Sequence, residues 1–123
     1  MLRRRLLALT ALTLAAATCF SQGNETIQMR PVKAQTLAGF VTAKANHRQP
    51  INDAHVEECD ADWKHVIAST MTDAEGHFRL TPVETGSIFY LRVYAPGFNI
   101  SQYPVTLSRF AHVELHLEMS VGT

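Results

Sequence analysis

Two histidines and a glutamate near the carboxyl end of the chain have the residue types and the spacing of metal ligands. Every odd position of 111–119 is apolar, whereas the even positions include His112, Glu114 and His116. In a strand these three side chains project from one face about 6 to 7 Å apart, so neighbouring pairs could share a zinc or copper ion. The alternative is that they only solvate the outer face of an edge strand, and the sequence leaves both interpretations open.

A second candidate site combines aromatic rings with a guanidinium. Residues 88–95 alternate, which places Tyr90, Arg92 and Tyr94 on one face of a predicted strand. Exposed rings at this spacing can stack on sugars or receive a protein partner, since a ring buries much area at little entropic cost. Trp63 lies in a predicted loop and is either packed on the core or exposed for binding. The alternative for this site is that neighbouring strands and loops cover it.

The sequence contains no catalytic constellation. A glycine-rich phosphate loop, a Cys-x-x-Cys pair and a Gly-x-Ser-x-Gly elbow are all missing. His55 and Glu58 match the His-x-x-Glu spacing of metallocarboxypeptidase ligands, but no catalytic domain accompanies them, and we interpret the match as chance. All eleven carboxylates but only eight of the eleven basic residues follow position 21, which gives that part a formal charge of −3. Because it also lacks a basic run, nucleic-acid binding is not expected. We predict a protein that is not an enzyme and has no cofactor.

The first 23 residues are typical of a secretory signal peptide. Three consecutive arginines precede an uncharged apolar run at 6–17, which is shorter than the roughly twenty residues that span a bilayer. We expect cleavage after Ser21 or Gly23 and a periplasmic or secreted protein with no stable membrane span. An uncleaved anchor and a lipid on Cys19 are the alternatives. After cleavage Cys59 is the only cysteine, which excludes an internal disulfide.

The remaining chain has the hydrophobic period of strands. A polar stretch at 24–36 is expected to be a linker, and turn-forming Gly, Pro and Asx residues then separate short alternating runs. These runs predict seven strands, at 37–43, 54–60, 65–72, 76–81, 88–95, 98–107 and 111–119. One sheet of this size would leave an apolar face in water, so two packed sheets are predicted. Pro104 cannot donate to a strand ladder and is expected on an edge strand or at a bulge.

The order of these strands and turns resembles the carboxypeptidase regulatory-like domain. The matching stretches are Gly-Phe-Val at 39–41, Gln-Pro-Ile-Asn-Asp-Ala-His-Val at 49–56, Thr-Asp-Ala-Glu-Gly-His-Phe-Arg-Leu at 72–80, and Leu-Arg-Val with Ala-Pro-Gly-Phe within 91–98. The resemblance implies an all-β, seven-stranded, antiparallel Greek-key β-sandwich of transthyretin-like type over 37–123. It also implies a non-catalytic accessory module of an exported bacterial protein. Asp53 departs from the pattern, since the family often has Gly there.

These observations predict a non-catalytic exported module that binds a cell-envelope or extracellular protein or a glycan, or has a structural role there. Two alternatives stay open: a carbohydrate-binding module that uses the tyrosines and the tryptophan, and a small metal-binding protein that uses the histidine face. The open edges of a sandwich would also permit self-association or strand addition by a partner.

Overall fold

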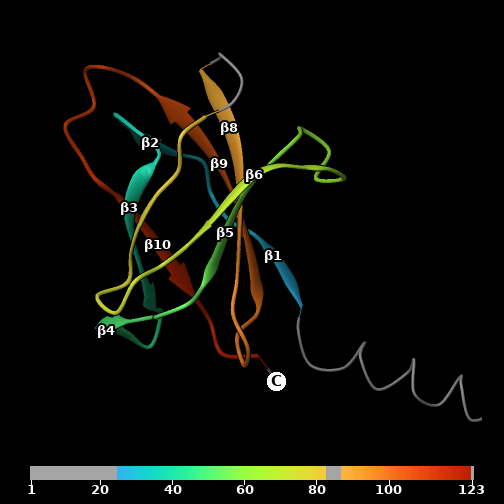
Figure 1. Cartoon of the computed structure of the whole chain (residues 1–123), viewed down its shortest axis with the longest axis vertical. Coiled ribbons are helices and arrows are strands. Elements are labelled where there is room, and N and C mark those ends of the chain that lie inside the picture. Colours follow the sequence, from blue (N-terminus) through green and yellow to red (C-terminus); the bar gives the residue numbers. More distant parts are fainter. Residues whose placement is uncertain (1–24, 83–86, 123) are drawn as a thin grey trace, which may run out of the picture.

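The described part of the chain is all-β. The computed structural model describes residues 25–82 and 87–122, and these ranges contain strands and turns but no helix (Figure 1). Accordingly, nothing in the described ranges is a helix that could cross a membrane. The predicted signal peptide with Cys19, and most of the turn expected at 84–87, lie outside the described residues.

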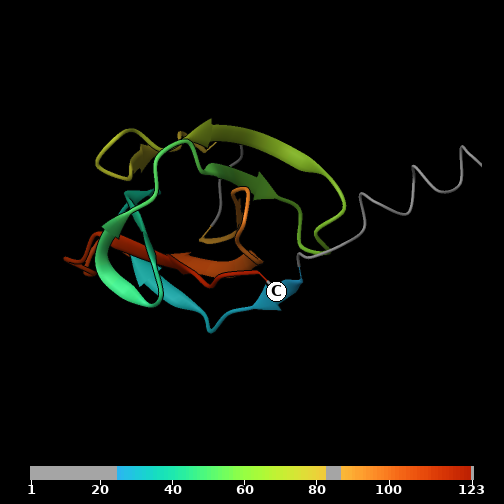
Figure 2. The same cartoon turned by 90° about the horizontal axis from the view of Figure 1, so that it is seen from below.

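Six strands form the larger sheet. Its strand order is β1-β9-β8-β5-β6, and β2 pairs with β9 farther along that strand. The strands are β1 (Thr26–Gln28), β2 (Val32–Ala34), β5 (His55–Cys59), β6 (Val66–Met71), β8 (Ile88–Tyr94) and β9 (Ile100–Leu107). β6 is one edge of this sheet and runs along the rim of the molecule (Figure 2).

Four strands form the smaller sheet around β3. They are β3 (Ala38–Ala43), β4 (Asn46–Pro50), β7 (His77–Arg79) and β10 (Leu115–Met119). β3 pairs in parallel with β10, and it pairs antiparallel with β4 and with β7. The backbones of β3 and β10 approach closely at Gly39, where an added Cβ would lie 1.9 Å from the carbonyl oxygen of Leu115.

The core lies between the inner faces of the two sheets. Strand alternation determines which side chains belong to the core. Phe89, Leu91 and Val93 of β8 are buried, whereas the residues between them are not. In β10 the same alternation buries Leu115 and Leu117. Each such side chain contributes about 1.5–3 kcal/mol when it leaves water, so the alternating runs determine which face turns inward.

The strand predictions are confirmed in position but wrong in number. Each of the seven expected ranges contains a strand, namely β3 and β5 to β10, whereas the described residues hold ten strands. The expectation of a fully antiparallel sandwich is also wrong. β1 and β2 pair in parallel with β9, and β10 pairs in parallel with β3.

Three strands were missed for identifiable reasons. The stretch 24–36 was expected to be a linker, but β1 and β2 lie within it, and at three residues each they are too short to show a period of two. β4 covers the stretch 47–50, for which its closing proline predicts a turn and not a strand. Its four leading positions are exposed, so it has no apolar alternation to reveal it.

Pro104 is not on an edge, contrary to expectation. β9 pairs with β8 on one side and with β1 and β2 on the other. The Ile100 N–H donates to Glu25 and the Gln102 carbonyl accepts from Met29, so the even residues of β9 direct their backbone groups towards β1 and β2. Pro104 therefore lies opposite the gap between these two strands, where no donor is needed.

Two turns each contain a residue with a positive φ. Gly76 has a φ of +79°, and the Asp73 carboxylate accepts the backbone N–H groups of Glu75 and His77. Asp53, at the position where the resembled family often has glycine, has a φ of 58°, in the left-handed region that glycine favours.

A buried threonine joins these two turns. The Thr72 hydroxyl accepts the Ala54 N–H at 2.8 Å and donates to the Ile51 carbonyl at 2.6 Å. The hydroxyl thereby satisfies two buried backbone groups where the chain enters β5.

Replacing Gly39 by alanine should destabilise the fold by about 3 kcal/mol, because the methyl group would collide with the backbone of β10. The free energy of unfolding from urea titration measures this loss. Gly97→Ala is the matched control: its φ is +86°, but no atom lies within 4 Å of the added Cβ, so only backbone strain of about 1–2 kcal/mol is expected. Equal losses in the two variants would contradict the close approach of β3 and β10.

Candidate binding face

The outer face of the larger sheet brings aromatic and charged side chains together. β8 directs Tyr90, Arg92 and Tyr94 away from the core, and all three are half-buried. β5 lies beside β8 and presents His55 and Glu57 on the same side. We call these five residues and Trp63 the aromatic face.

An ion pair lies at the centre of the aromatic face. The Arg92 Nε donates to the Glu57 Oε1 at 3.0 Å, and both side chains are mostly buried. The Arg92 Nη1 also donates to the Trp63 carbonyl at 3.2 Å. The Tyr94 hydroxyl donates to the second oxygen of Glu57 at 3.4 Å. The guanidinium is therefore held in one orientation by groups from two other segments of the chain.

Aromatic rings flank this ion pair on both sides. The His55 and Tyr94 rings stack in parallel with centroids 4.5 Å apart. On the other side, the Trp63 ring meets the Tyr90 ring edge-on at 5.5 Å. Burial and the nearby Glu57 carboxylate raise the pKa of the Tyr94 hydroxyl, so this hydroxyl stays protonated and can donate.

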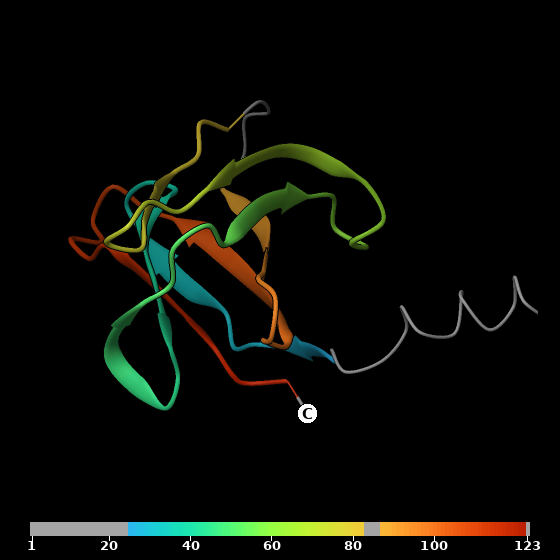
Figure 3. The same cartoon turned by 60° about the horizontal axis from the view of Figure 1, so that its bottom comes forward.

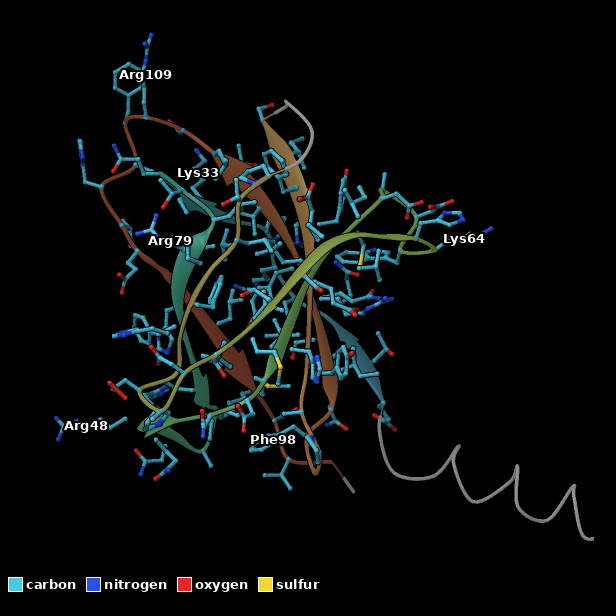
Figure 4. The ribbon with its side chains drawn as sticks, viewed as in Figure 1. Lys33, Arg48, Lys64, Arg79, Phe98 and Arg109 are labelled. Atoms are coloured by element: carbon cyan, nitrogen blue, oxygen red, sulfur yellow. The ribbon has the colours of Figure 1, made fainter. Side chains whose placement is uncertain are left out.

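The loop between β5 and β6 positions Trp63. The Asp60 carboxylate accepts the backbone N–H groups of Lys64 and His65 and also contacts the His65 ring at 2.8 Å. The Trp63 N–H donates to the Asp60 carbonyl. Trp63 itself has a φ of 64°, which a bulky residue adopts only when its surroundings require it. Lys64 marks the position of this loop in Figure 4.

A row of polar side chains crosses the sheet through the ion pair. The strand registers align Ser69 with Glu57, Glu57 with Arg92, and Arg92 with Gln102, which in turn faces Gln28. Beside this row is a shallow hollow of about 290 Å³. Its lining residues are Thr26, Glu57, Arg92, Tyr94, Ile100 and Gln102.

The four residues predicted for an aromatic site come together in the structure. Tyr90, Arg92, Tyr94 and Trp63 all belong to the aromatic face, and Trp63 both packs on Tyr90 and stays partly exposed. Sequence reasoning missed Glu57 as the partner of Arg92. Its only signal would have been the pairing register of β5 with β8, which a single sequence does not show.

The alternative of a metal site at His112, Glu114 and His116 finds no support among the described residues. β10 begins at Leu115, so the strand spacing assumed for His112 and Glu114 is wrong. Within 25–82 and 87–122, no three His, Cys, Asp or Glu side chains are placed to hold an ion. The expected strand failed because residues 111–114 alternate in polarity without pairing to a neighbour.

His116 instead belongs to a cluster on the outer face of the smaller sheet. Its ring stacks on Phe40 at 4.4 Å, and its Nε2 lies 2.6 Å from the Thr42 hydroxyl. His47 contacts Glu118 on the same face. These contacts give His116 a packing role on the outer face of the smaller sheet.

Two other features of the sequence can be placed in the structure, namely Cys59 and the His-x-x-Glu match of His55 and Glu58. Burial raises the pKa of the Cys59 thiol, and the side chain is 2% exposed, so it is a core residue and not a reactive thiolate. His55 lies outward on β5, whereas Glu58 is buried on its inner side with Val56. The His-x-x-Glu spacing therefore does not place these two residues together.

Comparison with known proteins adds no relative. No family model matches the chain, and no curated protein matches it. Any function must therefore be argued from the aromatic face and its geometry.

Order in the loop that carries Trp63 should depend on the charge of Asp60. Hydrogen bonds from the His65 side chain and from backbone amides lower the pKa of the Asp60 carboxyl below its usual range. Their contribution is complete above the ordinary value of 3.8 and is lost as the pH falls below it towards the folded-state pKa.

The loss of order in this loop at low pH can be followed by fluorescence, because Trp63 is the only tryptophan in the chain. We expect its emission to change below pH about 4 in the wild-type protein and to be nearly independent of pH there in Asp60→Asn. Asp53→Asn is the control, since that carboxylate lies in another turn, and it should behave like the wild type. An unchanged acid profile in Asp60→Asn would contradict the role of this carboxylate.

Proposed function

We propose that the chain is a non-catalytic, exported binding module that contacts a protein partner through the aromatic face. The observation that most supports this proposal is that the Arg92 side chain is held in one orientation. Its guanidinium is held by Glu57 and by the Trp63 carbonyl, with rings on both sides. Such an arrangement is ordered before any partner arrives, so little side-chain entropy is lost on binding.

The residue types favour a protein as the partner. Tryptophan, tyrosine and arginine are the residues that most often dominate binding energy at protein interfaces, and here they cluster on one face. Their half-buried state leaves ring and guanidinium surface available for contact. The ordered β5–β6 loop presents Trp63 at the border of this surface.

A carbohydrate-binding module is the second candidate. The row of Glu57, Arg92 and Gln102 beside aromatic rings offers the hydrogen-bonding groups that a sugar needs. The ring geometry is less favourable, because Trp63 and Tyr90 are nearly perpendicular at 85° and one face of Tyr94 is covered by His55. Stacking on successive sugar rings needs exposed, roughly coplanar platforms. We therefore rank this function below protein binding.

We also propose that the chain is a domain of the carboxypeptidase regulatory-like type. Its support is the ordered set of motifs over 37 to about 119, together with the turn chemistry of Asp73 and Gly76. On this proposal the two sheets form a Greek-key sandwich of transthyretin-like type. Members of that family are usually accessory modules without a catalytic site, which agrees with the lack of catalytic motifs in this sequence.

Export is the part of the proposal that the N-terminal segment supports. When the whole chain is expressed in a bacterial host, the purified protein should lack residues 1–21 or 1–23, because the charged start and the apolar run direct cleavage there. Intact-mass spectrometry measures the cleaved length. Cys19→Ser should give the same mass. A full-length product would contradict cleavage, and a heavier product that is lost in Cys19→Ser would indicate a lipid on Cys19.

Binding should depend on the aromatic face. The exported protein, immobilised and exposed to cell-envelope extract from its source, should retain a partner, and Trp63→Ala should weaken retention roughly tenfold or more. Arg79→Ala is the control and should leave retention of the partner unchanged. Arg79 lies on β7 in the other sheet, far in Figure 4 from Lys64, which marks the loop that carries Trp63. Quantitative mass spectrometry of the retained proteins measures both.

Three outcomes separate the candidates. Retention of one protein that is lost in Trp63→Ala and kept in Arg79→Ala supports the proposal. Equal retention by all variants contradicts it. Retention of no protein, with glycan-array binding that disappears in Tyr94→Ala, would replace it by the carbohydrate-binding function.

A further inference from the structure

The loop between β9 and β10 carries the most exposed aromatic ring among the described residues. This loop covers residues 108–114, and Phe110 within it is 78% exposed. Val113 of the same loop is 64% exposed. The loop extends away from the body of the sandwich in both Figure 1 and Figure 3. Single apolar residues on a surface are ordinary, but two of them on one projecting loop form a candidate contact.

Ser108 builds the turn that presents the Phe110 ring. Its hydroxyl accepts the Phe110 N–H at 3.2 Å, and its carbonyl accepts the Ala111 N–H at 3.0 Å. The Ser108 N–H donates to the Ala34 carbonyl at 2.9 Å, which attaches the turn to the last residue of β2. The ring is therefore exposed by a turn that has its own hydrogen bonds and a fixed attachment to the larger sheet.

Three cationic side chains gather at this end of the molecule, and Figure 4 labels all of them: Lys33, Arg79 and Arg109. The Arg109 guanidinium lies over the Phe110 ring, 5.4 Å from its centroid. Arg79 lines a hollow of about 250 Å³ together with Val113 of the loop. Lys33 lies on β2, directly before the residue to which the loop is bonded.

None of these three cations has an ion pair within the described residues. The ion pairs there involve His47, His65 and Arg92 instead. Glu114 is the one carboxylate of the loop, so three cations lie near a single carboxylate. Carboxylates on other parts of the molecule do not cancel this local excess, because charges more than about 8 Å away are largely screened at physiological ionic strength.

We propose that residues 108–114 with Lys33 and Arg79, which we call the basic tip, dock on an anionic phospholipid surface. Phe110 and Val113 enter the boundary between headgroups and acyl chains, and the cations contact the phosphates. Both contributions act in the same direction, because such binding grows with the apolar area buried and with the attraction to anionic lipid. The apolar stem of Arg109 can follow the ring while its guanidinium stays at the level of the phosphates.

The shape of the basic tip favours a bilayer over a protein as the occupant. A stable protein interface buries roughly 800 Å² on each partner and usually takes 20–30 residues from each, which one projecting turn does not supply. A protein would also need a pocket that fits the ring. The fluid headgroup region of a bilayer accepts a protruding side chain without one.

This inference does not depend on the function proposed for the aromatic face. Lys64 marks the loop that carries Trp63, and in Figure 4 it lies on a different side of the molecule from Arg109. Retention of a protein partner by the aromatic face therefore does not require Arg79 or any other part of the basic tip.

Co-sedimentation with vesicles tests the docking. The exported protein, made with Cys19→Ser so that no lipid on the chain contributes, should bind vesicles of phosphatidylglycerol and phosphatidylcholine. It should bind phosphatidylcholine alone at least tenfold more weakly. Phe110→Ser should lower the partition coefficient on the anionic vesicles about tenfold or more, because one ring no longer leaves water. Arg109→Gln should lower it about fivefold.

Val121→Ser and Arg48→Gln are the matched controls, and neither should change binding. Val121 is 62% exposed and forms a bridge with Phe98. In Figure 4, Phe98 and Arg48 lie at the end of the molecule opposite to Arg109. Circular dichroism and Trp63 fluorescence verify that each variant folds. Trp63→Ala should bind vesicles like the wild type, which separates this result from the function of the aromatic face.

Fluorescence quenching reports insertion directly. The emission of Phe110→Trp should fall on anionic vesicles whose acyl chains carry bromine. The emission of the wild type should not fall, because it comes from Trp63 alone and that residue lies away from the basic tip.

The proposal is overturned if the wild type does not bind anionic vesicles or binds both lipid compositions equally. It is also overturned if the controls lose as much binding as Phe110→Ser and Arg109→Gln. Retention of a protein from cell-envelope extract that disappears in Phe110→Ser, without vesicle binding, would replace the lipid surface by a protein partner. Loss confined to the two tip variants, together with quenching in Phe110→Trp, supports docking on the bilayer.

Discussion

The smaller sheet depends on the space left by one missing side chain. β3 pairs with three other strands, and it can do so because Gly39 lets the backbone of β10 approach closely. Without β10 the smaller sheet would lose Leu115 and Leu117 from its inner face, where both are almost fully buried. Thr72 has a comparable role in the turns, since one hydroxyl satisfies backbone groups from two positions near the start of β5. Both constraints act on backbone groups, which explains why small residues hold these positions.

The aromatic face is ordered from below by the sheet and from the side by the loop. The β5–β8 register puts Glu57 opposite Arg92, and the Asp60 turn puts the Trp63 carbonyl within reach of the same guanidinium. An arginine with two fixed acceptors presents a defined surface and not a mobile chain. The six residues therefore behave as a unit, and the loss of one partner would leave a mostly buried charge without compensation.

Much of this arrangement was accessible from the sequence because alternation is a local signal. The pattern of β8 and β10 predicted which residues face the core, and it also placed Tyr90, Arg92 and Tyr94 on one outer face. The strands that failed to show a signal were those of three residues and the polar β4, where no alternation exists. The parallel pairings and the Glu57–Arg92 contact depend on residues far apart in the chain. No single stretch of sequence contains that information, and Pro104 shows how a local rule fails when two short strands leave a gap.

The long-range pairings also restrict the order in which the fold can be completed. β1 and β2 stand at the start of the described chain, yet both pair with β9, and β3 pairs with β10, as the Thr42–His116 contact across 74 positions shows. Contacts of such sequence separation make folding slow, because a long loop must close before they form. A chain that emerges from a ribosome or a channel with its N-terminus first cannot close either sheet until its last quarter is free. Up to that point neither the pairing of β1 and β2 with β9 nor that of β3 with β10 exists, so these contacts would not have to break for the chain to pass through a narrow pore.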